Sequence, residues 1–74
     1  MMKIVKRKSE ITTGSIERNG TLVVRTDKLA RTSLRVTMSN KVYRLTNYKN
    51  GKSIRVRDYT TLAKMSVHVN IYHA

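Results

Sequence analysis

The 74-residue sequence predicts one small all-β domain with a mainly antiparallel sheet. Two Asn-Gly pairs, Asn19-Gly20 and Asn50-Gly51, lie between segments of alternating polarity. This is a strong signal for a tight hairpin, because both residues of the pair accept positive φ. With no proline and no cysteine, packing alone must hold the chain together. We expect residues 1–74 to form a small SH3-like or OB-like barrel, or a bent sheet, with one or two short helical turns.

The first part of the chain is expected to consist mainly of strands. They cover residues 2–8, 11–17 and 21–26. The last two flank Asn19-Gly20, and a three-residue loop that ends in the glycine brings their apolar side chains onto one face. This hairpin carries little charge, so its expected role is structural. The next segment, 26–32, is expected to form one helical turn with Thr26 or Asp27 as its N-cap.

Alternation of polarity is clearest in the segment 33–38, SLRVTM. Its leucine, valine and methionine point to one side of the predicted strand, while Arg35 and Thr37 point to the other. A period of two residues is typical of a half-buried antiparallel strand. This segment is therefore expected to contribute three side chains to the core.

Three further strands are expected in the second half of the chain. They cover residues 41–48, 52–58 and 66–72. The first two flank Asn50-Gly51 as a second hairpin, and residues 59–65 are expected to form a helical turn capped by Thr60 or Thr61. This order of hairpin, short helical turn and closing strand resembles the end of an SH3-like barrel. The resemblance covers about half of the chain and implies a fold, not a function.

The net charge of +12, from 16 Lys and Arg against four Asp and Glu, is the strongest functional signal in the sequence. Self-repulsion at this density disfavours a compact small domain unless a polyanion neutralises it. Nucleic acid is the commonest polyanion inside cells, so a domain this basic is expected to bind it. The alternative is a charged surface that serves solubility alone.

The second hairpin is predicted to gather positive charge on one face. Its two-residue loop pairs Arg44 with Arg57 across the ladder and places Arg55 and Tyr48 on the same face. Arginines directly opposite each other destabilise a sheet, so their presence favours an anion-binding face. Guanidinium forks match phosphate oxygens, and a tyrosine can stack on an exposed base. The alternative is a solvated face whose arginine stems cover the sheet.

The predicted nucleic-acid site also includes the tip lysines of this hairpin, an arginine of the segment 33–38 and the N-terminal basic run. Its members are Arg44, Arg55, Arg57, Tyr48, Lys49, Lys52, Arg35, Lys6, Arg7 and Lys8. For the N-terminal run, protection of an exposed edge strand by charge is an equal alternative. These groups address the phosphate backbone and imply no base-specific readout.

No catalytic, metal or cofactor chemistry is expected from this sequence. It has no cysteine nucleophile, and its four acidic residues are scattered. His68 and His73 have no evident carboxylate partner in the sequence, and two histidines are too few for a metal site without other ligands. Both are therefore expected to be polar surface residues.

The sequence thus predicts a non-enzymatic nucleic-acid-binding protein, with DNA or RNA and the oligomeric state left open. One alternative is a small inhibitor or adaptor that docks on an acidic protein surface, for example a phage-encoded protein that binds a host factor, since both partners attract the same charges. A structural component of a virion or ribosome is a third interpretation. The chain has no long apolar run and no secretory h-region. We therefore expect a location inside a cell (the host cytoplasm if phage-encoded) and no membrane partner.

Overall fold

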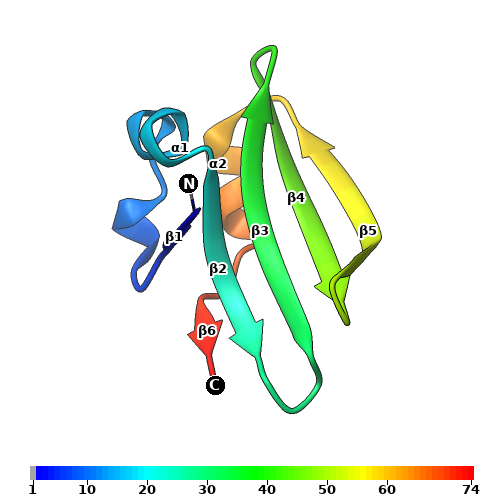
Figure 1. Cartoon of the computed structure of the whole chain (residues 1–74). Coiled ribbons are helices and arrows are strands. Elements are labelled where there is room, and N and C mark those ends of the chain that lie inside the picture. Colours follow the sequence, from blue (N-terminus) through cyan, green and yellow to red (C-terminus); the bar gives the residue numbers. More distant parts are fainter. Residues whose placement is uncertain (1) are drawn as a thin grey trace.

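A six-stranded mixed sheet forms the body of the computed structural model, which describes residues 2–74 (Figure 1). Met1 of the predicted domain lies outside the described residues. The strands are β1 (Met2–Ile4), β2 (Thr21–Asp27), β3 (Thr32–Ser39), β4 (Val42–Lys49), β5 (Lys52–Tyr59) and β6 (Tyr72–His73). They follow the order β1-β2-β3-β4-β5, with β6 beside β2. The predicted β-rich fold is confirmed, and within residues 2–74 the sheet is not closed into a barrel.

The long strands β3, β4 and β5 lie where the sequence predicted strands. All neighbours from β2 to β5 are antiparallel, whereas β1 and β6 pair with β2 in parallel. Asn50 and Gly51 form the β4–β5 turn with φ of 53° and 78°, as the Asn-Gly signal requires. The predicted N-terminal strand is shorter than expected, because it ends at Ile4 and a 3₁₀ turn, η1, follows at Lys8–Glu10.

The segment before the first Asn-Gly pair is a helix and not a strand. This helix, α1, spans Thr13–Asn19. The hydroxyl of Thr12 accepts the backbone N–H of Ser15 at 3.1 Å and so caps the helix N-terminus. Gly20 ends the helix with a φ of 79°. The predicted first hairpin is wrong, because a helix C-terminus favours the same left-handed glycine on which the hairpin signal rests.

The two predicted helical turns have different outcomes. The later one is present as α2, which spans Leu62–Val67, and the hydroxyl of Thr61 accepts a backbone N–H of its first turn at 3.2 Å. The helical turn predicted over 26–32 is wrong, and β2 and β3 are joined there by a non-helical loop. In that loop the Asp27 carboxylate accepts the N–H of Ala30 at 3.1 Å. Asp27 therefore caps a turn, as aspartate commonly does.

The strand predicted over 66–72 is also wrong. Val67 is 76% exposed, whereas Met65 and Val69 are fully buried. A spacing of four residues between buried side chains is typical of a helix, and α2 covers the first part of this segment. Only Tyr72–His73 pairs with β2, as β6.

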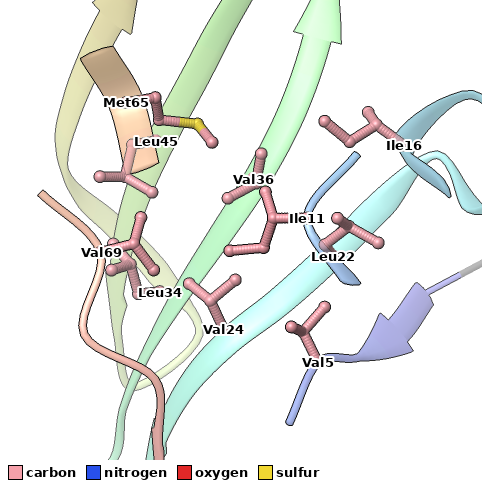
Figure 2. Close-up of a cluster of buried hydrophobic side chains, with 10 residues drawn as sticks. All are labelled: Val5, Ile11, Ile16, Leu22, Val24, Leu34, Val36, Leu45, Met65 and Val69. Atoms are coloured by element: carbon pink, nitrogen blue, oxygen red, sulfur yellow. The ribbon is translucent and has the colours of Figure 1, made fainter. Parts of the chain in front are cut away.

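The hydrophobic core lies on one face of the sheet, which we call the inner face, and both helices contribute to it. The buried side chains are Val5, Ile11, Ile16, Leu22, Val24, Leu34, Val36, Leu45, Met65 and Val69. Figure 2 shows this cluster extending from Met65 and Leu45 at one end to Ile16, Leu22 and Val5 at the other. We call the opposite side of the sheet the outer face.

The C-terminal strand is tied to β2 and to the N-terminal segment through His73. Its Nε2 lies 2.7 Å from the carbonyl oxygen of Val5, and its Nδ1 lies 3.1 Å from the hydroxyl of Thr26. Because a carbonyl oxygen only accepts, Nε2 donates to Val5, and the Thr26 hydroxyl is the hydrogen-bond partner of Nδ1. The N–H of Ala74 adds a bond to the Thr26 carbonyl at 2.8 Å.

Two carboxylates are held in their charged form by hydrogen bonds. Glu10 Oε2 accepts the backbone N–H of Lys6 at 2.7 Å and that of Arg7 at 3.4 Å, and chiefly the first bond lowers the pKa of Glu10. Asp58 Oδ1 accepts from Nε of Arg44 at 2.9 Å, and this bond lowers the pKa of Asp58. In both cases the folded protein favours the ionised acid.

Acid should therefore destabilise the fold through these two groups. Their pKa values are lower in the folded than in the unfolded chain, so the unfolded chain binds more protons in acid. The stability that they contribute is present above the ordinary carboxyl pKa of about 4 and is lost as the pH falls below it. We expect the urea midpoint to fall from about pH 5 to about pH 3, and Glu10→Gln/Asp58→Asn to show a smaller fall. An equal fall in the double variant would contradict this assignment.

Candidate anion-binding site

The β4–β5 ladder contains a one-residue bulge at Ile54. At the tip the strands pair as predicted, with Lys49 opposite Lys52. The register then shifts, so that Asn47 lies opposite Arg55 and Ile54 has no partner across the ladder. Because side chains alternate between faces, every pair beyond the bulge differs from the regular hairpin that the sequence suggested.

The bulge separates the hairpin residues that were expected to share a face. Arg57 lies opposite the buried Leu45, so Arg57 and Arg55 are on the inner face. Arg44 and Tyr48 are on the outer face, because each is an odd number of positions from Leu45 along β4. The predicted single basic face of Arg44, Arg55, Arg57 and Tyr48 is therefore wrong, as is the pairing of Arg44 with Arg57.

Charge explains why the shifted register is preferred. Arg44 lies opposite Asp58 and forms a two-point ion pair, with Nε 2.9 Å from Oδ1 and Nη2 3.3 Å from Oδ2. The regular register would instead set Arg44 against Arg57, and like charges directly opposite each other destabilise a sheet. The side chains of Arg44 and Asp58 are 53% and 46% exposed, so solvent weakens their attraction. Avoiding the repulsion between Arg44 and Arg57 therefore also contributes to the preference for the bulged register.

The other residues of the predicted site lie elsewhere. β3 neighbours the hairpin as expected, but Arg35 is on the outer face, with its guanidinium carbon 4.5 Å from the centroid of the Tyr48 ring. This cation–π contact occupies one side of the ring on which a base was expected to stack. Lys6, Arg7 and Lys8 follow β1, at the opposite edge of the sheet from β5 (Figure 1). The structure therefore divides the predicted site into separate regions.

A second bulge, at Val24 in β2, adds another arginine to the inner face. Val24 has no partner across the ladder, and Arg25 comes to lie opposite Leu34. Arg25 then borders one pocket of about 250 Å³ together with Arg55 and Arg57. The residues lining the pocket are Arg25, Leu34, Leu45, Asn47, Arg55, Arg57, Tyr59 and His68. We call Arg25, Arg55 and Arg57 the arginine cluster.

The pocket combines positive charge with a lining that is mostly polar. Among residues 2–74, no carboxylate contributes to its lining. Leu34 and Leu45 belong to the hydrophobic core, so the pocket continues the core toward solvent. The rings of Tyr59 and His68 are stacked, with centroids 5.4 Å apart and an angle of 27° between their planes. The Tyr59 hydroxyl is buried and has no hydrogen-bond partner within the described chain, which is an uncommon and costly arrangement.

The sequence did not identify four polar residues of this pocket. They are Arg25, Asn47, Tyr59 and His68. For Arg25 the run Leu22-Val23-Val24 is a usable signal. Three successive buried residues in one strand break the alternation and indicate a bulge. His68 follows α2 directly. The predicted helical turn ended at residue 65, and a strand was expected from residue 66, so the position of His68 was not foreseen. Nothing local to Asn47 or Tyr59 distinguishes them from other strand residues.

The arrangement suits the binding of an anion. Three guanidinium groups converge on one pocket, and each presents donors that match phosphate or carboxylate oxygens. Residues 2–74 contain no group of three or more His, Cys, Asp or Glu placed to hold a metal ion. No helix in the described part of the chain is long and apolar enough to cross a membrane.

Comparison of the chain with protein-family models, with curated proteins and with solved structures gives no match. Relatives therefore contribute nothing to the choice of function. That choice rests on the chemistry of the arginine-lined pocket and on the distribution of charge around it.

The register of the bulged hairpin can be tested by cross-linking, because the sequence contains no cysteine. In Arg44→Cys/Asp58→Cys the two residues are direct neighbours, with Cα atoms about 4.5 to 5.5 Å apart, which is within reach of a disulfide. In Arg44→Cys/Arg57→Cys, the pair of a regular ladder, the side chains point to opposite faces. Mass spectrometry after mild oxidation should find a disulfide in the first variant only. Preferential cross-linking of the second would contradict the bulge.

Proposed function

We propose that this protein is a non-enzymatic nucleic-acid-binding protein that holds phosphate groups through the arginine cluster. The observation that supports this most directly is a pocket lined by three arginines and, within residues 2–74, by no carboxylate. Arg55 and Arg57 are exposed, and the one ion pair in the described chain is formed by Arg44 and Asp58. The guanidinium groups of the cluster are therefore available to an external anion.

The tip of the hairpin extends this positive surface. Lys49 lies two residues from Asn47 along β4 and faces Lys52 across the ladder, so alternation places both lysines on the inner side. Five cationic side chains thus run from the pocket to the tip. The net charge of +12 adds a long-range attraction that speeds the approach of a polyanion. By contrast, the charge of Arg44 on the outer face is partly neutralised by Asp58.

An acidic protein surface is the alternative partner, since it attracts the same charges. A protein interface typically has an apolar centre and a polar rim, whereas the exposed lining of this pocket is mostly polar. Guanidinium groups around a pocket match the regularly spaced phosphates of a nucleic acid at least as well as they match the scattered carboxylates of an acidic protein. For these reasons we favour nucleic acid as the partner.

The finer fold assignment and the location belong to the same proposal. The hairpin, α2 and β6 follow the order of the last elements of an SH3-like barrel, and β6 lies beside β2. An OB-like sheet is the alternative. Because fold does not determine function, this likeness carries no weight for the choice of partner. A nucleic-acid partner in turn implies a location inside the cell.

Removal of the arginine cluster should weaken binding strongly. We expect the variant Arg25→Gln/Arg55→Gln/Arg57→Gln to bind a fluorescent single-stranded DNA at least about tenfold more weakly at low salt, as measured by anisotropy. Each phosphate contact to a single strand contributes about 0.7 to the slope of log K against log salt concentration. Loss of three contacts should therefore reduce that slope by about 2.

The control variant removes the same charge from exposed positions away from the pocket, as Lys3→Gln/Arg18→Gln/Lys41→Asn. It should bind nearly as the parent does. An equal loss in both variants would show that net charge, not the arginine cluster, determines binding. If the parent fails to bind single-stranded DNA, duplex DNA and RNA at low salt, the proposed function is rejected and an acidic protein becomes the partner to seek.

A further inference from the structure

We infer that the pocket receives one unpaired base of a nucleic-acid strand, while the arginine cluster holds the phosphates beside that base. This inference rests on the proposed function and specifies it further, because it makes single-stranded nucleic acid the preferred ligand. It is drawn from the shape and lining of the pocket, and the observations that support it concern its volume, its aromatic wall and the side-chain amide of Asn47.

Leu34 and Leu45 line the pocket, but they are only 2% and 6% exposed and belong to the core. The lining that a ligand can touch is therefore mostly polar. The faces of a base can stack on flat side chains of such a lining, and its edges can form hydrogen bonds there. The volume of about 250 Å³ lies just below the range of roughly 300 to 1,000 Å³ that is typical of small-molecule pockets. It therefore suits one base better than a larger ligand.

The walls present groups on which bases stack. Bases in single strands commonly stack on tyrosine and histidine rings and on the planes of guanidinium groups. Tyr59 is supported by its contact with His68, which restricts the ring. Arg25 is half-buried, unlike the exposed Arg55 and Arg57. We assign Arg25 to the wall beside the base, and the other two arginines to phosphates at the rim.

One polar side chain of the lining is available to the edge of a base. Asn47 is half-buried opposite Arg55, and its side-chain amide offers both donors and an acceptor. The hydroxyl of Tyr59 is covered by protein atoms, so the contribution of Tyr59 to a bound base comes from its ring.

A duplex cannot use the pocket without disruption. Its bases are paired and stacked, and removing one from the stack costs free energy that an unpaired strand does not have to supply. The phosphates of a duplex can still reach the rim. The structure therefore predicts binding of both forms, with the single strand bound more tightly at equal salt concentration.

The test compares strands that carry the same phosphates with and without bases. A fluorescent single-stranded DNA is compared by anisotropy with a strand of equal length in which the central nucleotides are abasic, and with a duplex. We expect the parent to bind the intact strand about tenfold more tightly than the abasic strand, which is a usual effect of base–aromatic stacking. The duplex should be bound more weakly than the intact single strand.

Two charge-neutral variants test which groups of the pocket contact the base. Asn47→Leu removes the amide at similar size, and Tyr59→Phe removes only the buried hydroxyl. Asn47→Leu should weaken binding of the intact strand several-fold and leave the affinity for the abasic strand unchanged, whereas Tyr59→Phe, which keeps the stacking ring, should change neither affinity. Tyr48→Phe on the outer face is the matched control and should change neither. Far-UV circular dichroism of each variant checks its fold, and Tyr59→Phe keeps the ring that packs against the core.

Each outcome has a definite meaning. Equal affinity of the parent for intact and abasic strands would overturn the base pocket and leave a phosphate site, so the proposed function would stand. Base-dependent binding that Asn47→Leu does not change would place the base elsewhere and also overturn the inference. If the parent binds none of these three DNAs and no RNA but binds an acidic peptide, the proposed function itself fails.

Discussion

A single unpaired residue, Ile54, determines on which side of the sheet the last arginines of the hairpin lie. Strand side chains alternate strictly between faces, so one additional residue reverses the assignment of all those that follow. The bulge at Ile54 keeps Arg55 and Arg57 on the inner face and leaves Arg44 opposite Asp58. The bulge at Val24 has a similar effect in β2. Without these two irregularities, regular alternation would place Arg25, Arg55 and Arg57 on the outer face, away from the pocket.

The pocket and the hydrophobic core are parts of one surface. Leu34 and Leu45 contribute to both. Elsewhere the inner face is closed by α1 and α2, whose first turns are capped by Thr12 and Thr61, and by the N-terminal segment, which His73 holds at Val5. α2 reaches β5 at Tyr59, whose ring stacks on that of His68, and Arg55 and Arg57 border the pocket together with Arg25. Mutual repulsion of these charges opposes compaction, so a bound polyanion would stabilise the fold that creates its own site.

The sequence predicted the central strands well and the ends of the chain poorly, for physical reasons. β3 to β5 alternate in polarity, and the Asn50-Gly51 turn has one favourable geometry. Asn19-Gly20 was ambiguous, since a left-handed glycine ends a helix as readily as it turns a hairpin. Val67 and Val69 have the spacing of side chains on one face of a strand, but Val67 is the last residue of α2 and Val69 lies beyond the helix end. These decisions depend on packing against β2 and β4, which local pattern does not contain.

The candidate site was predictable in kind but not in composition. Excess positive charge near the second hairpin, with Arg55 and Arg57 as members, was visible from composition and spacing. The membership of Arg25 required knowledge of two bulges in strands far apart in the sequence. Whether a bulge forms depends on which cross-strand pairs are more favourable, here Arg44 with Asp58 or Arg44 with Arg57. The prediction of a regular ladder was made without this comparison.

The bulge lies in one strand of the hairpin only. β4 alternates without interruption from Leu45 to Lys49, whereas in β5 the phase of alternation changes at Ile54, between Ser53 and Arg55. The faces of Arg55 and Arg57 are therefore set by their partners on β4 and not by their distance from the turn. In evolutionary terms, the turn residues can diversify while the arginines below them and the folded core remain unchanged.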